Sequence, residues 1–207
     1  VDTHVHADHV SGVRTLAESG ADVVLPAGAD DRGLAFEPDR RLADGDSLRV
    51  GDVLIDAVAL PGHTTEMTGL ALGDLHLVGD TLFLRSVARP DLEAGAEGAP
   101  ELARRLHATL GERIRALPDD SRIAPGHFAD PADARDRLYV DALPALVGSI
   151  PALSMDEDAF VDHVVSDVPP RPNNYERIID VNLGRETADD ETAFELELGP
   201  NNCAVSA

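Results

Sequence analysis

Apolar side chains recur at helical spacing in the middle of the chain. Leu102, Leu106, Leu110, Ile114 and Leu117 follow one another at intervals of four and three residues. That spacing places all five side chains on one face, so the pattern predicts an amphipathic helix over residues 101–117. Weaker patterns and capping residues predict shorter helices over residues 11–20, 136–146, 155–165 and 174–183.

Two β-hairpins are predicted in the first half of the chain. Each joins two short apolar runs through a Gly-Asp turn: residues 48–50 with 53–60, and residues 68–72 with 75–78. Further strands are expected over residues 22–26 and 122–124, loops over 27–46 and 86–100, a stiff extended segment over 169–172, and an acidic tail after residue 183. Strands dominate the first half and helices the second, with an intermixing that indicates an α/β layered fold.

Composition and charge narrow the class of protein. The 207 residues, 43% of them hydrophobic, suit one domain that is large enough to bury a core. The net charge of −22 argues against nucleic acid or an anionic membrane as a partner, because both require clustered cations. Every basic residue is Arg and the acidic residues are dispersed, which favours adaptation to high salt. A GC-rich genome is the alternative explanation.

Several cellular features are expected from what the sequence lacks. It has no apolar run of about 18 residues, so no membrane-spanning helix is expected. No secretory leader is visible at its start, so a cytoplasmic location is expected. The single cysteine, Cys203, excludes an internal disulfide and a multi-cysteine metal site. Because Cys203 stands in a polar tail, we expect it to have no chemical role.

Potential metal ligands gather in a short segment and at three later strand ends. His4, His6, Asp8 and His9 lie within six residues of one another. Three further candidates each follow a predicted strand and a glycine: His63, Asp80 and His127. A lone histidine is usually a surface or core residue, but five of the eight histidines here occupy such positions. Imidazole and carboxylate together suit Zn, Fe(II) or Mn, so the sequence predicts a metal centre.

The order and context of these ligands, from Thr3 to His127, resemble the metallo-β-lactamase superfamily. The resemblance implies an αββα sandwich with the metal site at one edge of its two sheets. Since Val1 stands directly before the motif, we expect the chain to lack the N-terminal strands of this fold. Residues 1–207 are then a single domain, with residues 169–207 as a C-terminal extension that packs on it.

Two branches of the superfamily remain close: persulfide dioxygenases and thioester hydrolases of glyoxalase II type. The segment Gly79–Phe83 suits both. The segments Ser86–Leu92 and Pro169–Ile178, together with Asn182, resemble the persulfide dioxygenases. We therefore expect a non-haem iron persulfide dioxygenase, with a glyoxalase II-like hydrolase as the alternative. A third hypothesis is that the chain is a non-catalytic fragment with exposed sheet edges.

The two branches imply different uses of the same residues. In a dioxygenase, one Fe(II) is held by the counterparts of His4, His63 and Asp80, and O2 oxidises the terminal sulfur of a low-molecular-weight thiol persulfide to sulfite. The other four candidates then surround this centre, with Asp8 and His9 as candidate catalytic groups. In a hydrolase, two Zn(II) ions act on a thioester. One is held by His4, His6 and His63 and the other by Asp8, His9 and His127, with Asp80 between them.

Substrate contacts are less specific in the sequence. Arg89, in the loop after Asp80, and Arg171, in the proline-rich segment, are candidates to bind a carboxylate of the thiol carrier. Either arginine could instead pair with a nearby acidic residue. Tyr175 could stack or hydrogen-bond near the site, or simply pack. A homodimer is compatible with this interpretation.

Overall fold

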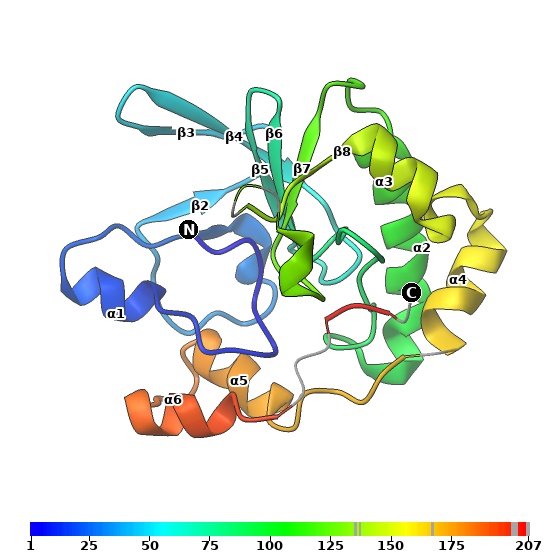
Figure 1. The fold of residues 1–207 in the computed structure, drawn as a ribbon. Coiled ribbons are helices and arrows are strands. Elements are labelled where there is room, and N and C mark those ends of the chain that lie inside the picture. The colour runs from blue at the N-terminus through cyan, green and yellow to red at the C-terminus, as the bar shows by residue number, and fades with distance from the viewer. Residues whose placement is uncertain (135, 137, 167, 200–202, 206–207) are drawn as a thin grey trace.

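The computed structural model describes residues 1–134, 136, 138–166, 168–199 and 203–205. A six-stranded sheet in the order β3-β4-β5-β6-β7-β8 forms its centre (Figure 1). Its strands are β3 (Ser47–Val50), β4 (Val53–Ala59), β5 (Thr68–Leu72), β6 (Leu75–Gly79), β7 (Arg122–Pro125) and β8 (Asp141–Ala142). All neighbours are antiparallel except β6 and β7, which run parallel. Both predicted hairpins are confirmed: β3 pairs with β4 and β5 with β6.

A second, smaller sheet pairs β1 (Val24–Pro26) with β2 (Arg40–Leu42) in parallel. The strand β2 lies in the segment that was expected to be a loop, so that expectation is wrong for these three residues. Leu42 is buried with Val24, Ala57 and Leu70 in a small cluster that joins the two sheets. Burial against the larger sheet therefore makes a strand of residues whose local sequence is typical of a loop.

The helices lie in two groups (Figure 1). On one side lie α2 (Gly95–Thr109), α3 (Leu143–Ser149) and α4 (Glu157–Ser166), and near the N-terminal segment lie α1 (Val13–Glu18), α5 (Tyr175–Asn182) and α6 (Asp190–Leu196). Short 3-10 helices cover Ala27–Ala29, Pro131–Asp133 and Pro151–Ser154. The main core fills the space between the sheet, α2 and α4, where Val78, Leu106, Ile123 and Phe160 are buried. No helix in the described part of the chain combines the length and apolarity needed to cross a bilayer.

The helix predicted over residues 101–117 begins earlier and ends differently. It starts at Gly95, inside the segment expected to be a loop, and contains Pro100. Beyond Thr109 the chain continues as a π-helical turn over Leu110–Ile114. The predicted apolar stripe nevertheless faces the core, because Leu102 and Leu106 are both buried. Packing has thus decided the ends of this helix and the sequence pattern its orientation.

Two expectations for the second half need correction. The helix expected over residues 136–146 is confirmed only for its last part, because α3 begins at Leu143, whereas Asp136 has a φ of 51° and β8 comes before α3. Pro144 lies in the first turn of α3, a position where its missing N–H costs no helical hydrogen bond. The acidic tail expected after residue 183 contains the helix α6. Residues 137, 200–202, 206 and 207, which these two expectations also cover, lie outside the described residues.

The last described residues return to the centre of the molecule. Residues 203–205 run beside residues 87–89, where the Arg89 N–H donates to the Cys203 carbonyl and the Val205 N–H donates to the Val87 carbonyl. An antiparallel bridge joins Ala88 and Ala204. This pairing carries Cys203 to the ends of the strands that hold the predicted metal ligands.

Candidate metal centre

Three of the predicted ligands form a buried triad at one end of the central sheet. His4 lies in the N-terminal segment, His63 follows the turn after β4, and Asp80 directly follows β6. Asp80 Oδ2 lies 3.9 Å from His4 Nε2 and 3.7 Å from His63 Nε2. Two atoms that each lie about 2.1 Å from one metal ion can be at most about 4.2 Å apart, so both distances allow a shared ion.

Hydrogen bonds at the far side of each imidazole leave the inner nitrogens available. His63 Nδ1 is 2.8 Å from the carbonyl oxygen of Arg89. Since a carbonyl only accepts, Nδ1 carries a proton, and in the neutral imidazole the lone pair is then on Nε2, which faces Asp80. His4 Nδ1 pairs with the Thr3 hydroxyl at 3.0 Å. Such partners orient metal-binding histidines in known sites.

The three side chains of the triad face one another with acceptor atoms that have no donor in the described part of the chain. This arrangement is unfavourable unless a cation lies between them. Two atoms of the triad, His4 Nε2 and Asp80 Oδ2, are buried without a hydrogen-bond partner among the described residues, and so is Nδ1 of the adjoining His6. Burial and the neighbouring His6 hold the pKa of His4 well below its usual value, so the imidazole is neutral. Neutral imidazoles and a carboxylate are the donor set of a borderline divalent cation, and the residues present therefore fit such an ion.

The remaining four candidates form an adjoining group in which His127 is central. His127 Nδ1 pairs with Asp80 Oδ1 and its Nε2 with Asp8 Oδ2, both at 2.8 Å. Burial opposes its charge, but the hydrogen bonds to the two carboxylates and their charges raise the pKa of His127 to about 10. The protonated ring then donates to both carboxylates and compensates part of their negative charge.

His6 and His9 complete this second group, and ligand atoms of His6, Asp8 and His9 converge within 4.8 Å. Burial and the nearby His9 lower the pKa of His6 to about 4. Burial opposes the charge of His9 too, but the hydrogen bond and charge of Asp8 raise its pKa. The structure thus brings all seven predicted ligands together in two adjoining groups. The hydrogen bond between His127 and Asp80 links one group to the other.

Glycines allow the ligands to come this close. Gly62, directly before His63, has a φ of 149°, and a Cβ there would lie 2.5 Å from Leu106 Cα. A Cβ on Gly126, directly before His127, would lie 2.4 Å from Asp80 Oδ1. Larger residues at either position would displace a ligand or the helix behind it.

No protein-family model matches the chain. The mitochondrial persulfide dioxygenase ETHE1 of Homo sapiens is 33% identical over 132 residues, which cover 61% of this chain and 47% of that protein. A hydroxyacylglutathione hydrolase of Xylella fastidiosa is 34% identical over 141 residues, which cover 67% of this chain and 50% of that protein. The chain therefore spans about half the length of these relatives.

Comparison with solved structures establishes the fold of the chain. A metallo-β-lactamase from Staphylococcus aureus superposes with a TM-score of 0.75 at 26% identity, over 87% of this chain and 56% of that one. ETHE1 from Myxococcus xanthus superposes with a TM-score of 0.73 at 28% identity, over 89% of this chain and 75% of that one. The chain has the metallo-β-lactamase fold. Its homologues are persulfide dioxygenases and hydroxyacylglutathione hydrolases, which confirms the predicted resemblance.

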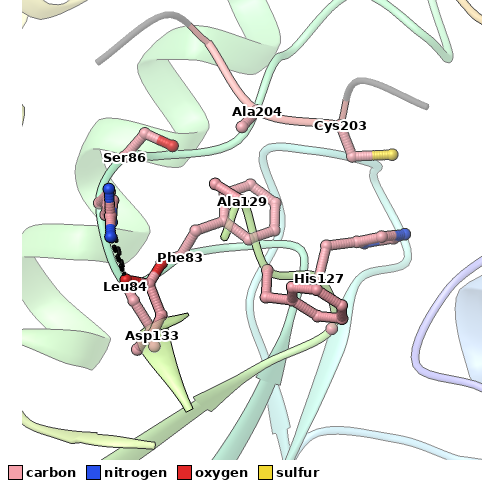
Figure 2. A pocket seen from close by; sticks show the side chains of 11 residues that line it. Phe83, Leu84, Ser86, His127, Ala129, Asp133, Cys203 and Ala204 are labelled. Carbon is pink, nitrogen blue, oxygen red and sulfur yellow. Dashed lines mark hydrogen bonds and ion pairs between the residues drawn. The ribbon is translucent and has the colours of Figure 1, made fainter. Parts of the chain in front are cut away.

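A cavity of about 490 Å³ opens beside the candidate metal centre (Figure 2). Phe83, Leu84, Phe128 and Ala129 supply most of its apolar wall, and His127 reaches into it from the second ligand group. Phe128 stacks on Tyr139 with ring centroids 4.0 Å apart. The cavity therefore offers a largely apolar approach to the buried ligands.

Cys203 also lines this cavity, so the expectation that it stands in a polar tail is wrong, whereas its lack of a chemical role stays a prediction. It is 4% exposed, and Figure 2 shows its sulfur at the same end of the cavity as the His127 ring. Ligand atoms of Asp8, His127 and Cys203 lie within 4.8 Å of one another. Burial and the charges of Asp80 and Asp8 raise the pKa of the Cys203 thiol well above its usual value. Only the long-range pairing of residues 203–205 reveals this position.

Asn182 holds the histidine-rich segment in place. Its Nδ2 donates to the carbonyl oxygens of His6 and His9 at 3.0 and 2.9 Å, and its Oδ1 accepts from the Ser11 N–H. The sequence marked Asn182 only through a resemblance, and nothing in the local pattern indicated this contact. The end of α5 therefore fixes the backbone that carries four ligands.

The three candidate substrate residues occupy one ion-pair cluster. Arg89 is 1% exposed and donates to both carboxylate oxygens of Asp91, at 2.7 and 3.1 Å. Arg171 donates to Asp91 at 2.8 Å and to the Tyr175 hydroxyl at 3.1 Å. Burial opposes the charge of Asp91, but both guanidinium groups lower its pKa. This geometry favours the alternative in which the arginines pair with an acidic residue, and their role toward a substrate stays a prediction.

Proposed function

We propose that the chain is a mononuclear Fe(II) persulfide dioxygenase that oxidises a low-molecular-weight thiol persulfide to sulfite. The observation that carries this proposal is the buried triad of His4, His63 and Asp80, whose facing atoms lie 3.7 to 3.9 Å apart. Two histidines and one carboxylate that leave positions open are the donor set of non-haem iron oxygenases. The human and Myxococcus relatives named ETHE1 support the same assignment.

When bound, Fe(II) supplies the one-electron chemistry that reaction with O2 requires. Overall, RSSH, O2 and water give RSH and sulfurous acid: both atoms of O2 go to the terminal sulfur, and the S–S bond breaks. His127 holds Asp80 through Oδ1 and so leaves Oδ2 for the metal. Phe83 and Phe128 in the cavity wall offer apolar surface to a substrate beside the centre.

The second candidate is a dinuclear thioester hydrolase. It is favoured by the convergence of His6, Asp8 and His9 beside His127, and by the identity to a hydroxyacylglutathione hydrolase. Two metal ions would lower the pKa of a water between them and provide the nucleophile. His127 contacts both Asp8 and Asp80, and in this candidate it would instead hold the second metal ion together with Asp8 and His9.

O2 uptake distinguishes the two candidates. The chain is loaded anaerobically with Fe(II) in high salt, and a low-molecular-weight persulfide is added in an oxygen-electrode cell. We expect uptake matched by sulfite, its loss in Asp80→Ala, and wild-type uptake in His163→Ala, a histidine on α4 outside both ligand groups. A folded, iron-loaded chain that consumes no O2 but whose zinc form cleaves a glutathione thioester would establish the hydrolase instead.

The remaining expectations about partners stay predictions. The substrate is a small molecule in either candidate, as the names of both relatives also indicate for those proteins. The human relative is mitochondrial by name, and for this chain the cytoplasmic location inferred from sequence is tested by fractionation. A homodimer is tested by light scattering in high salt.

A further inference from the structure

A buried carboxylate behind the candidate metal centre belongs to none of the ligand groups that converge among the described residues. The side chain of Glu66 has no exposed surface. Its Oε1 accepts from the backbone N–H of Val5 at 2.9 Å, and Val5 stands between His4 and His6 in the histidine-rich segment. An ionised group this deeply buried requires a counter-charge and a full set of hydrogen bonds.

Arg32 supplies that counter-charge. One guanidinium nitrogen, Nη1, lies 2.8 Å from each carboxylate oxygen of Glu66 and 3.4 Å from Glu93 Oε2. The Arg32 side chain is itself only 10% exposed. Arg185, just after α5, donates to the backbone carbonyl of Arg32 and so holds the loop that presents it.

The other carboxylate fixes the second half of the centre. Glu93 accepts from the Thr65 backbone N–H at 2.6 Å and from its hydroxyl at 2.8 Å. Thr65 stands two residues after His63, in the turn that delivers this ligand. The Glu66–Arg32–Glu93 network therefore connects the segment that carries His4 to the turn that carries His63.

We propose that Glu66 and Arg32 are positioning residues that set the separation of His4 and His63. The hydrogen bond to Val5 fixes the backbone at His4, while Glu66 and Glu93 hold the turn after His63 to the same guanidinium. Neither Glu66 nor Arg32 belongs to a ligand group that converges among the described residues. The inference rests on the proposed metal centre. The network differs from an ordinary surface ion pair because Glu66 is buried and accepts hydrogen bonds on both carboxylate oxygens.

Zinc affinity tests this without reference to activity. The dissociation constant of Zn(II) is measured for each variant by competition with a chromophoric chelator in high salt. Glu66→Ala removes the acceptor for the Val5 N–H, and we expect the Kd to rise about 10- to 100-fold. Glu66→Gln retains an amide oxygen that can accept this N–H, so it should recover most of the affinity.

A matched control separates positioning from general loss of stability. Leu146→Ala creates a cavity at a fully buried position on α3, a helix that carries none of the candidate ligands. Urea unfolding of metal-free Leu146→Ala and Glu66→Ala measures how much stability each variant has lost. Leu146→Ala should keep the wild-type Kd. An equal loss of zinc affinity in Leu146→Ala at equal loss of stability would overturn the inference.

The Arg32→Lys variant tests the same network if Glu66→Ala does not fold. It keeps a counter-charge for Glu66, but an ammonium cannot reproduce the planar guanidinium between two carboxylates. We expect its Kd to rise about tenfold, and a folded Arg32→Lys with the wild-type Kd would refute the network's role. A wild-type chain that binds no zinc would instead overturn the proposed metal centre, and this inference with it.

Discussion

Substitution of His63 and of His127 should affect metal retention very differently if one ion is bound by the buried triad. His63 Nε2 faces Asp80 Oδ2 at 3.7 Å, whereas both nitrogens of His127 are engaged by carboxylates. His63→Ala therefore removes a ligand. His127→Ala removes two hydrogen bonds that orient Asp80 and Asp8.

The expected magnitudes follow from these contacts. A four-ligand zinc site binds with about 10–16 kcal/mol, or about 3–4 kcal/mol per ligand, so His63→Ala should weaken binding by about 100- to 1,000-fold. Loss of an outer partner typically costs about 10- to 100-fold. For His127 part of that loss is offset, because its pKa of about 10 leaves a proton beside the site that repels an incoming cation. We expect a change of at most about tenfold for His127→Ala.

Iron retained after anaerobic desalting, together with the zinc dissociation constant, measures both effects. The His163→Ala variant serves as the control for loss of a histidine outside the site. If His127→Ala loses metal as completely as His63→Ala, or if the wild-type chain holds two ions and His127→Ala one, the mononuclear assignment is wrong.

Three further predictions concern stability and reactivity. His127 has a folded pKa of about 10, above its unfolded value of 6.5, so its stabilisation is complete below about pH 6.5 and disappears as the pH rises through 10. The melting temperature of the metal-free chain should thus fall from pH 7 to pH 10 more steeply than that of His127→Gln, and parallel curves would contradict this. Asn182→Asp removes the donor to the His6 and His9 carbonyls and should cost about 2–4 kcal/mol in urea unfolding; an unchanged urea midpoint would show that these bonds do not hold the segment. Because Cys203 is buried and the pKa of its thiol is raised, a thiol reagent should modify it at least about tenfold more slowly than in the urea-unfolded chain, and equal rates would exclude its buried position.

Much of the local structure could be predicted because it depends on neighbouring residues. The Gly-Asp turns predict both hairpins, and the spacing from Leu102 to Ile114 predicts which face of α2 is buried. The ends of elements could not be predicted in the same way. The strand β2 and the early start of α2 at Gly95 depend on what packs against them, which local patterns do not contain.

The same distinction between local sequence and long-range packing applies to the candidate site. The sequence alone identified the seven candidate ligands and predicted three of them at strand ends, because strand, glycine and candidate ligand follow one another within a few residues at His63, Asp80 and His127. Only the tertiary structure placed Cys203, Asn182 and the Glu66–Arg32 pair at the candidate site, because their contacts join residues that are far apart in the chain. It also decided the grouping of the ligands. Which nitrogen faces which oxygen depends on distances of a few ångströms between separate loops, and no spacing along one chain specifies them.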